Sequence, residues 1–325
     1  MTHEAPRLLV LRALGVGDLL TAVPALAALA RAFPDHRRHL AAPPALAPLL
    51  ELLPGGFTLV AAEPLAALTP SLARPAVGVN LHGRGPQSHR VLLDARPGRF
   101  LAFSHPDVSE TMGMPRWRPG EHEASRWCRM LQEVGVPADA RDLDVPGPSG
   151  PAPTAFEGAT VIHPGAASPA RRWPAERFSA VARAEREAGR RVVITGSPDE
   201  IPLAREVAAG AGLEHEAVLA GQTDLAALAG VVAIAGRVVC GDTGVAHLAT
   251  ALGTPSVVLF GPTSPLEWGP PAERPHHRVL WSGTTGDPHG AGADPGLLRL
   301  SVEQVLTELE WLSGRILKLV PFRRL

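Results

Sequence analysis

A carboxylate follows a glycine turn near the N-terminus of the sequence. Gly15-Val16-Gly17-Asp18 comes after the short aliphatic run Arg7–Leu11 and before the Ala-rich stretch Leu19–Phe33. This order predicts a strand, a turn and a helix, with Asp18 at the carboxyl end of the strand and beside a helix N-terminus, where the helix dipole favours its charged form. On these residues alone, Asp18 is either a functional carboxylate or a helix N-cap.

The same turn does not match the dinucleotide-binding fingerprint. In the pattern G-x-G-x-x-G, the third glycine would fall at position 20, which is Leu20. An isolated G-x-G is weak evidence for such a site. We therefore expect no NAD site at this turn.

A second polar cluster lies in the middle of the chain. His163-Pro-Gly-Ala-Ala-Ser-Pro-Ala-Arg-Arg-Trp-Pro174 joins a predicted strand end to a helix that Pro174 opens. Small residues let backbone N–H groups approach an anion, and guanidinium groups can form paired hydrogen bonds with phosphate oxygens. The loop predicts an anion site with Ser168, Arg171 and Arg172, and a solvent-exposed arginine pair is the alternative.

A third cluster connects an apolar strand directly to an Ala-rich helix. It reads Cys240-Gly-Asp-Thr-Gly-Val-Ala-His247, and Asp242 or Thr243 would cap the helix in any case. The functional interpretation is that free backbone N–H groups at Thr243, Gly244 and the next residue hold a diphosphate, with His247 one turn further along. A histidine that is packed in the core is an equally weighted alternative for His247.

Two further polar segments have residues that could bind a ligand. The loop Asn80-Leu-His82-Gly-Arg84-Gly-Pro-Gln87-Ser88 follows a predicted strand and is either part of a binding cleft or an ordinary surface loop. The triplet Asp142-Leu-Asp144 has the D-x-D form of a metal-diphosphate site, but it lies away from any predicted strand end. We therefore expect no metal site.

The elements that would position these clusters alternate between strand and helix. Short apolar runs at 38–42, 58–61, 76–81 and 100–103 complete a first parallel sheet, and a helix at 121–134 closes it. A second alternation has strands at 160–163, 191–195, 238–240 and 256–260, with helices at 174–188, 198–209, 223–232 and 244–252. We predict Rossmann-like domains at 1–140 and 159–312, a Pro/Gly-rich linker at 141–158, and a cleft between the domains.

The composition narrows the classes of function. At 325 residues the chain is long enough for two domains, and its formal charge of -1 with 4% aromatic residues provides neither a phosphate-binding face nor a stacking platform for nucleic acid. The two cysteines, Cys128 and Cys240, have no CxxC partner. No signal peptide or membrane span is recognisable, so we expect a cytoplasmic, monomeric protein.

The C-terminal segment 313–325 combines basic and aliphatic residues. It follows a predicted helix at 302–312 and contains Lys318, the only lysine of the chain, and Pro321. Packing back on the body is the favoured interpretation, because the segment is short and Pro321 breaks it. A weak contact with the inner membrane surface is the alternative.

Together the motifs resemble the ADP-heptose:lipopolysaccharide heptosyltransferase family, glycosyltransferase family nine. The resemblance rests on the segment 8–18 with Pro24-Ala-Leu, on 163–166 with Arg-Arg-Trp-Pro-Ala-Glu-Arg-Phe178, and on the run 242–263, which contains Asp242-Thr-Gly-Val-Ala-His247 and Phe260-Gly-Pro-Thr263. These motifs occur in family order along nearly the whole chain.

This resemblance implies a GT-B fold, inversion at the anomeric carbon, and no catalytic metal or cofactor beyond the ADP-sugar substrate. The donor would bind the C-terminal domain, and a hydroxyl-bearing glycan, glycolipid or small molecule would bind the N-terminal domain. Asp18 matches the catalytic base of the family. On the nucleotide side the resemblance adds Gly196, Ser197, Gly261 and Thr263 to the diphosphate residues, and on the acceptor side it adds Gly17 to His82, Arg84 and Gln87.

One position departs from the family pattern. Arg171 stands where the family has a phosphate-contacting lysine, and a planar guanidinium is not equivalent to a compact ammonium group.

Two other functions on the same fold stay open at this point. They are a nucleotide-sugar epimerase or hydrolase, and a non-catalytic nucleotide-sugar-binding protein.

Overall fold

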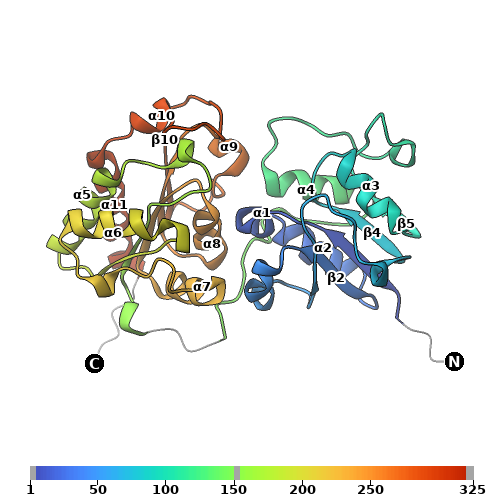
Figure 1. Ribbon diagram of the computed structural model, residues 1–325, viewed down its shortest axis with the longest axis horizontal. Helices are drawn as coiled ribbons and strands as arrows, with labels where there is room; N and C mark the ends of the chain where they lie inside the picture. The colour runs from blue at the N-terminus through green and yellow to red at the C-terminus, as the bar shows by residue number, and fades with distance from the viewer. Residues whose placement is uncertain (1–4, 150–153, 320–325) are drawn as a thin grey trace. The chain divides into compact units, whose positions relative to one another are not determined.

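The computed structural model describes residues 5–149 and 154–319, with side chains up to 314. The chain divides into two compact units, Met1–Pro146 and Gly147–Leu325. Each unit contains one parallel five-stranded sheet with helices packed around it (Figure 1). The prediction of two Rossmann-like domains is confirmed.

The N-terminal domain has the strand order β3-β2-β1-β4-β5, and all neighbouring strands are parallel. The elements are β1 (Arg7–Leu11), α1 (Val16–Thr21), α2 (Val23–Ala32), β2 (Arg37–Ala42), β3 (Thr58–Ala61), β4 (Val77–Asn80), α3 (Gln87–Asp94), β5 (Arg99–Leu101) and α4 (Glu123–Glu133), with 3-10 turns at Pro44–Leu52, Pro70–Leu72 and Ser109–Thr111.

The predicted helix 19–33 is in fact two helices. Helix α1 begins at Val16, and the regular structure is interrupted at Ala22 before α2 continues. Pro24 lies in the first turn of α2 and has no backbone N–H to donate to the preceding turn, which is the physical reason for the break. The N-cap of α1 is Gly15, so Asp18 is the third helical residue rather than the N-cap of the alternative interpretation, and its side chain accepts from the Gly15 backbone N–H as in a capping box.

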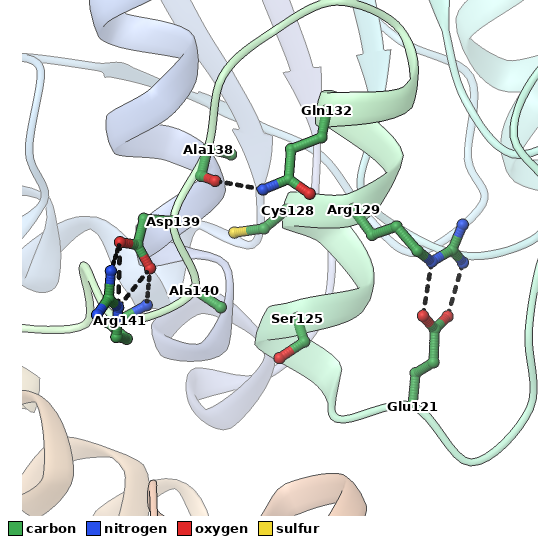
Figure 2. A pocket seen from close by; sticks show the side chains of 9 residues that line it. All are labelled: Glu121, Ser125, Cys128, Arg129, Gln132, Ala138, Asp139, Ala140 and Arg141. Carbon is green, nitrogen blue, oxygen red and sulfur yellow. Dashed lines mark hydrogen bonds and ion pairs between the residues drawn. The ribbon is translucent and has the colours of Figure 1, made fainter. Parts of the chain in front are cut away.

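Helix α4 packs against α2 and continues into an irregular segment. Between the helix and residues 138–141 lies a pocket of about 550 Å³ (Figure 2). Its walls are held by internal pairs, since Arg129 binds Glu121 through two hydrogen bonds of 2.6 Å and Arg141 binds Asp139 at 2.6 Å. Cys128 also lines this pocket, and burial raises the pKa of its thiol to about 12.

The C-terminal domain has the strand order β10-β9-β8-β6-β7, again fully parallel. The elements are β6 (Thr160–His163), α5 (Ala175–Glu187), β7 (Val192–Ile194), α6 (Ile201–Ala211), α7 (Leu225–Ile234), β8 (Arg237–Gly241), α8 (Gly244–Leu252), β9 (Ser256–Phe260), α9 (Pro265–Trp268), β10 (His277–Trp281), α10 (Pro295–Leu298) and α11 (Val302–Leu319), with 3-10 turns at Thr154–Phe156, Pro169–Arg171, Pro198–Glu200 and His215–Ala217.

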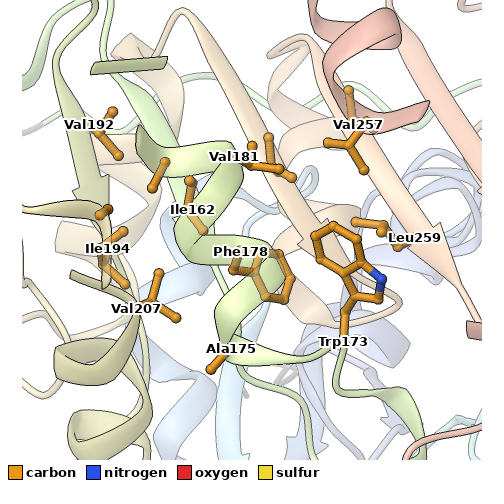
Figure 3. Packing of buried hydrophobic residues seen from close by; sticks show 14 of the residues in the cluster. Ile162, Trp173, Ala175, Phe178, Val181, Val192, Ile194, Val207, Val257 and Leu259 are labelled. Carbon is orange, nitrogen blue, oxygen red and sulfur yellow. The ribbon is translucent and has the colours of Figure 1, made fainter. Parts of the chain in front are cut away.

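A hydrophobic core lies between this sheet and helices α5, α6 and α11 (Figure 3). Trp173 and Phe178 are both 1% exposed and meet edge to face, with ring centroids 5.1 Å apart. The Trp173 indole N–H donates to the Leu300 oxygen at 3.2 Å. This buried pair fixes the start of α5, and with it the polar loop that precedes the helix.

Two elements of this domain differ from the prediction. Strand β10 was not predicted, because it is a short edge strand with a polar start and mostly half-buried residues. Helix α11 was expected to end at Leu312, but it continues through Gly314 to Leu319. One glycine costs a helix only about 1 kcal/mol relative to alanine, which does not end it. Residues 320–325 of the predicted tail lie outside the described part of the chain.

Candidate functional site

The N-terminal domain brings its polar residues together where the strand order reverses. Strands β1 and β4 are neighbours, although β2 and β3 separate them in sequence. In open parallel sheets, ligands bind beside the carboxyl ends of strands at such a reversal. The residues that follow β1 include Arg12 and Asp18, and those that follow β4 include Leu81 and His82.

Asp18 is held by the start of its own helix. Its Oδ2 accepts a hydrogen bond of 3.2 Å from the Gly15 backbone N–H, which satisfies one of the free donors at the helix N-terminus. Its Oδ1 lies 3.5 Å from Nη2 of Arg12. The Asp18 side chain is 28% exposed, so the carboxylate is fixed on one side and open to solvent or substrate on the other.

Arg12 is the residue that organises this end of the domain. It is 1% exposed and directly follows β1. Its Nε donates to the Asp18 backbone oxygen at 3.0 Å and its Nη1 donates to the Leu81 oxygen. Its Nη2 donates to Glu123 Oε1 at 3.0 Å and lies 3.4 Å from the Thr21 hydroxyl. One guanidinium therefore connects the ends of β1 and β4 with α1 and α4.

Glu123, the first residue of α4, is buried behind Arg12. Its Oε1 also accepts a 2.8 Å bond from the Trp127 indole, and its Oε2 accepts one from Arg126. Burial alone would raise the pKa of this carboxyl, but the charges of Arg12 and Arg126 together with these hydrogen bonds lower it. Glu123 is therefore charged at neutral pH. The buried side chains form a row of alternating charge, in which the Glu123 carboxylate lies between the guanidinium groups of Arg12 and Arg126.

The loop after β4 is also positioned by buried hydrogen bonds. Asn80 Oδ1 accepts from the His82 backbone N–H at 2.8 Å, and Asn80 Nδ2 donates to His89 Nδ1 at 2.7 Å. His89 Nε2 then donates to the Phe103 oxygen at 2.7 Å, which assigns the proton to Nε2. His89 was not predicted from the sequence as a site residue. In the structure His89 fixes the Asn80 side chain, and Asn80 in turn fixes the start of the loop.

His82 lies half-buried near Asp18, and its Nδ1 has no hydrogen-bond partner among the described residues. Burial and the charge of Arg12 lower the pKa of His82, while the charge of Asp18 opposes this. The neutral imidazole is therefore favoured. Of the other predicted acceptor-side residues, Gly17 is half-buried in α1, whereas Arg84 and Gln87 are exposed, with Gln87 as the first residue of α3.

The C-terminal domain has its own strand-order reversal, between β6 and β8. The loop after β6 contains Ser168, Arg171 and Arg172, and the turn after β8 contains Asp242 and Thr243. A side chain on Gly241, the last residue of β8, would lie only 2.9 Å from the Arg171 backbone oxygen. The absence of that side chain lets the two loops meet.

Arg171 and Asp242 are in contact at this point. Nη1 of Arg171 lies 3.4 Å from the Asp242 backbone oxygen and 3.9 Å from its carboxylate Oδ2. Nε of Arg171 is buried without a hydrogen-bond partner among the described residues, so part of the guanidinium has no acceptor from the chain. Arg172 donates instead to the Ala166 oxygen at 2.9 Å and supports the loop, and Ser168 Oγ caps the short turn that contains Arg171.

Helix α8 begins beside this contact. Its N-cap residue, Thr243, has an extended backbone and makes no side-chain capping hydrogen bond. The Ala246 N–H is bonded to the Thr243 backbone oxygen at 3.0 Å, so the N–H groups that the helix start can offer to an anion are those of Gly244 and Val245. The half-buried His247 ring packs edge to face with Trp268, with the ring centroids 6.0 Å apart.

Glu200 is a further acidic residue at the same sheet edge, and sequence reasoning missed it. Its carboxylate accepts from the Ser197 backbone N–H at 2.8 Å and lies 3.9 Å from Nε2 of His163, with 11% of the side chain exposed. A side chain on Gly165 would overlap this carboxylate. Burial lowers the pKa of His163, while Glu200 opposes it. Ser197-Pro-Asp-Glu200 has the S-x-x-E form of a capping box, which was the available signal.

The remaining predicted nucleotide-side residues are less informative. Gly196 lies half-buried after β7, and Thr263 is half-buried after β9. Gly261 is buried against the chain itself, because a side chain there would lie 2.9 Å from Leu297. Its tight fit therefore has a packing reason.

The Asp142-Leu-Asp144 triplet lies apart from both clusters. Asp142 pairs with Arg31 at 2.8 Å, and Asp144 is exposed. Within the described ranges, no group of three or more His, Cys, Asp or Glu side chains is arranged to hold a metal. Neither the pocket in Figure 2 nor a second one of about 660 Å³ beside residues 113–118 is lined by Asp18, Arg171 or Asp242. No helix in the described residues is long and apolar enough to cross a membrane.

Comparison with known proteins relates the C-terminal part of the chain to a sequence family. The sequence model of glycosyltransferase family 9 (heptosyltransferase) matches residues 137–287, which include Arg171, Glu200 and Asp242. Lipopolysaccharide heptosyltransferase 2 of Escherichia coli (strain K12) is 35% identical over 106 residues, or 32% of this chain and 30% of that protein. The enzyme of the same name from Salmonella typhimurium is 31% identical over 153 residues, or 43% of this chain and 42% of that protein.

The likeness of fold extends further than the likeness of sequence. The matched segments span less than half the length of these curated relatives. The solved structure of E. coli ADP-heptose lps heptosyltransferase II superposes with a TM-score of 0.76 at 22% identity, covering 95% of this chain and 99% of that one. The resemblance to the heptosyltransferase family and the GT-B class of fold are confirmed.

Proposed function

We propose that this chain, a relative of the glycosyltransferase family 9 heptosyltransferases, transfers a heptose-like sugar from an ADP-sugar to a hydroxyl acceptor. The observation that carries the proposal is the contact of Arg171 with Asp242 beside the uncapped start of α8. It lies inside the segment that matches the family, and it offers a guanidinium and free N–H groups to a diphosphate. The ADP-sugar is inferred from the similar E. coli enzyme, which is named for ADP-heptose.

The proposed reaction needs a base and a stabilised leaving group. Asp18 removes the proton of the acceptor hydroxyl while that oxygen attacks the anomeric carbon and the bond to the diphosphate breaks. The departing diphosphate is stabilised by Arg171 and by the N-terminus of α8. Attack from the face opposite the leaving group inverts the anomeric carbon. No metal or further cofactor takes part in this scheme.

The acceptor side is proposed to be the loop after β4 together with α1. Neutral His82 near Asp18 can donate a hydrogen bond to a hydroxyl group or accept one from it, and half-buried Gly17 directly precedes Asp18 in α1. A lipopolysaccharide core is the acceptor that the relatives' names suggest. Another glycan, a glycolipid or a small hydroxylated molecule fits the same chemistry.

Calorimetric titration of ADP, UDP and GDP without metal tests the donor part of the proposal. Preference for ADP supports it, preference for UDP or GDP overturns the donor, and absence of binding by all three overturns the site. The reaction is then tested with ADP-heptose and a lipopolysaccharide-core saccharide. Products formed from the donor alone would indicate an epimerase or hydrolase, and tight ADP-heptose binding without turnover on any acceptor would indicate a non-catalytic binding protein.

A further inference from the structure

We propose that Arg12 is the positioning residue that aims the Asp18 carboxylate, and that Glu123 takes up part of the Arg12 charge that would otherwise weaken Asp18 as a base. This inference rests on the proposed function, in which Asp18 removes a proton. The base and its two supporting residues all belong to the N-terminal domain.

The geometry of Arg12 fits a positioning role better than a surface ion pair. Its guanidinium is buried and donates to the backbone on both sides of the strand-order reversal, to Asp18 O at 3.0 Å and to Leu81 O. The Trp127 ring lies under it, with the guanidinium carbon 5.1 Å from the ring centroid. Because backbone contacts and ring stacking fix the plane of the group, its Nη2 has one direction in which to meet Asp18.

The Arg12 guanidinium lies closer to the Glu123 carboxylate than to the Asp18 carboxylate. Nη2 is 3.0 Å from Glu123 Oε1 but 3.5 Å from Asp18 Oδ1. A carboxylate that pairs closely with arginine becomes a weaker base, since the opposite charge stabilises its ionised form. Glu123 takes the shorter contact, so Asp18 is oriented by Arg12 without a close ion pair.

The Glu123 carboxylate is itself fixed by hydrogen bonds. Trp127 donates to its Oε1 and Arg126 donates to its Oε2, and Arg126 stacks over Trp117 with its guanidinium carbon 4.2 Å from the ring centroid. Asp18 thus lies beside the guanidinium of Arg12 after β1, with Glu123 of α4 on the other side of that guanidinium, and its charge also acts on His82 after β4.

The substitution Glu123→Gln tests the charge division, because it preserves shape and the oxygen acceptor but removes the charge. We measure the titration of the Asp18 carboxyl carbon by NMR, assigned with Asp18→Asn. The midpoint for Asp18 should move to lower pH by about half a unit or more, since Arg12 loses its partner. Glu121→Gln is the matched control, because Glu121 pairs with Arg129 and not with Arg12. An unchanged midpoint in Glu123→Gln would overturn the inference.

Kinetics with ADP-heptose provide the second readout. In Glu123→Gln we expect kcat to fall about two- to threefold at neutral pH, with the acid limb of the pH profile displaced to lower pH, while the KM for ADP-heptose stays unchanged. Arg12→Lys keeps the charge but loses the planar group, and it should lower kcat in the same way. Wild-type kcat and pH profile in both variants would also overturn the inference. If the wild-type protein transfers no sugar, the proposed function fails, and the NMR titration still decides this inference.

Discussion

Arg171 and Asp242 lie 71 residues apart in the sequence, yet Nη1 of Arg171 is 3.4 Å from the Asp242 backbone oxygen. The contact joins the loop after β6 to the turn after β8, which are neighbouring strands at the strand-order reversal. It holds the guanidinium at the start of α8 while leaving its Nε without an acceptor from the described chain. This is the arrangement from which the donor-site predictions follow.

Arg171→Ala should weaken ADP binding by on the order of 2–4 kcal/mol, because a partly buried charged contact to the diphosphate is lost. The measurement is a calorimetric titration of ADP. Arg205→Ala, at an exposed position on α6, is the control and should bind ADP as the wild type does. Arg171→Lys should recover part of the affinity, since it returns the charge without the planar group. Wild-type affinity in Arg171→Ala would remove this residue from the donor site.

Asp18→Asn should lower the turnover number by roughly 10²–10⁴ and leave ADP affinity unchanged, because general-base catalysis contributes about that factor. Single-turnover rates with ADP-heptose and the calorimetric Kd for ADP separate the two effects. The asparagine can still accept a hydrogen bond from the Gly15 N–H, so α1 should remain intact. Loss of ADP binding in this variant would show that Asp18 acts mainly on structure.

Treatment with EDTA should leave the rate of sugar transfer unchanged, because Arg171 and the start of α8 supply the positive charge in the proposed mechanism. The rate is compared before and after dialysis against EDTA, and again after Mg²⁺ is added. A variant that carries both Asp142→Asn and Asp144→Asn should have wild-type activity. A rate that depends on Mg²⁺, or inactivation by the double substitution, would revive the D-x-D interpretation.

Stability should decrease between pH 6.5 and pH 3 because of His277. Its Nδ1 lies 2.9 Å from Ser256 Oγ, and burial, followed by the charges of His276 and Arg274, lowers the pKa of His277 to about 3. In the unfolded chain His277 is protonated as the pH falls below about 6.5, whereas in the folded chain it is protonated only near pH 3. The free energy of unfolding therefore falls by up to about 1.4 kcal/mol per pH unit in this window. Above pH 6.5 the full stability is present.

The contribution of His277 is isolated by His277→Asn, whose amide can still bond to Ser256. Urea unfolding at pH 7 and pH 5 should show that the wild type loses about 2 kcal/mol more than the variant over this interval. The loss in the free energy of unfolding between pH 7 and pH 5 is compared between the wild type and the variant, because the other buried histidines contribute equally to the loss in both proteins. Equal losses in the two proteins would contradict the assignment of this effect to His277.

Local sequence determined the elements and the strand ends of both domains. Aliphatic runs at Arg7–Leu11, Thr160–His163 and Ser256–Phe260 are strands with the predicted bounds, because their apolar content and length suit a buried parallel sheet. Elements without a clear apolar pattern were predicted less well. Strand β10 at the sheet edge was missed, and the break before Pro24 divided a predicted helix.

Motifs in the sequence also placed Asp18, Arg171 and Asp242 at strand ends, because a glycine turn or a small-residue loop after an apolar strand is a local feature. Tertiary structure decided which of these residues meet and what supports them. Glu123 on α4 lies 111 residues from Arg12, and no periodicity or motif relates the two. Their pairing depends on how α4 packs at the β1–β4 reversal, because burying one charge requires a partner that only the folded chain brings into reach.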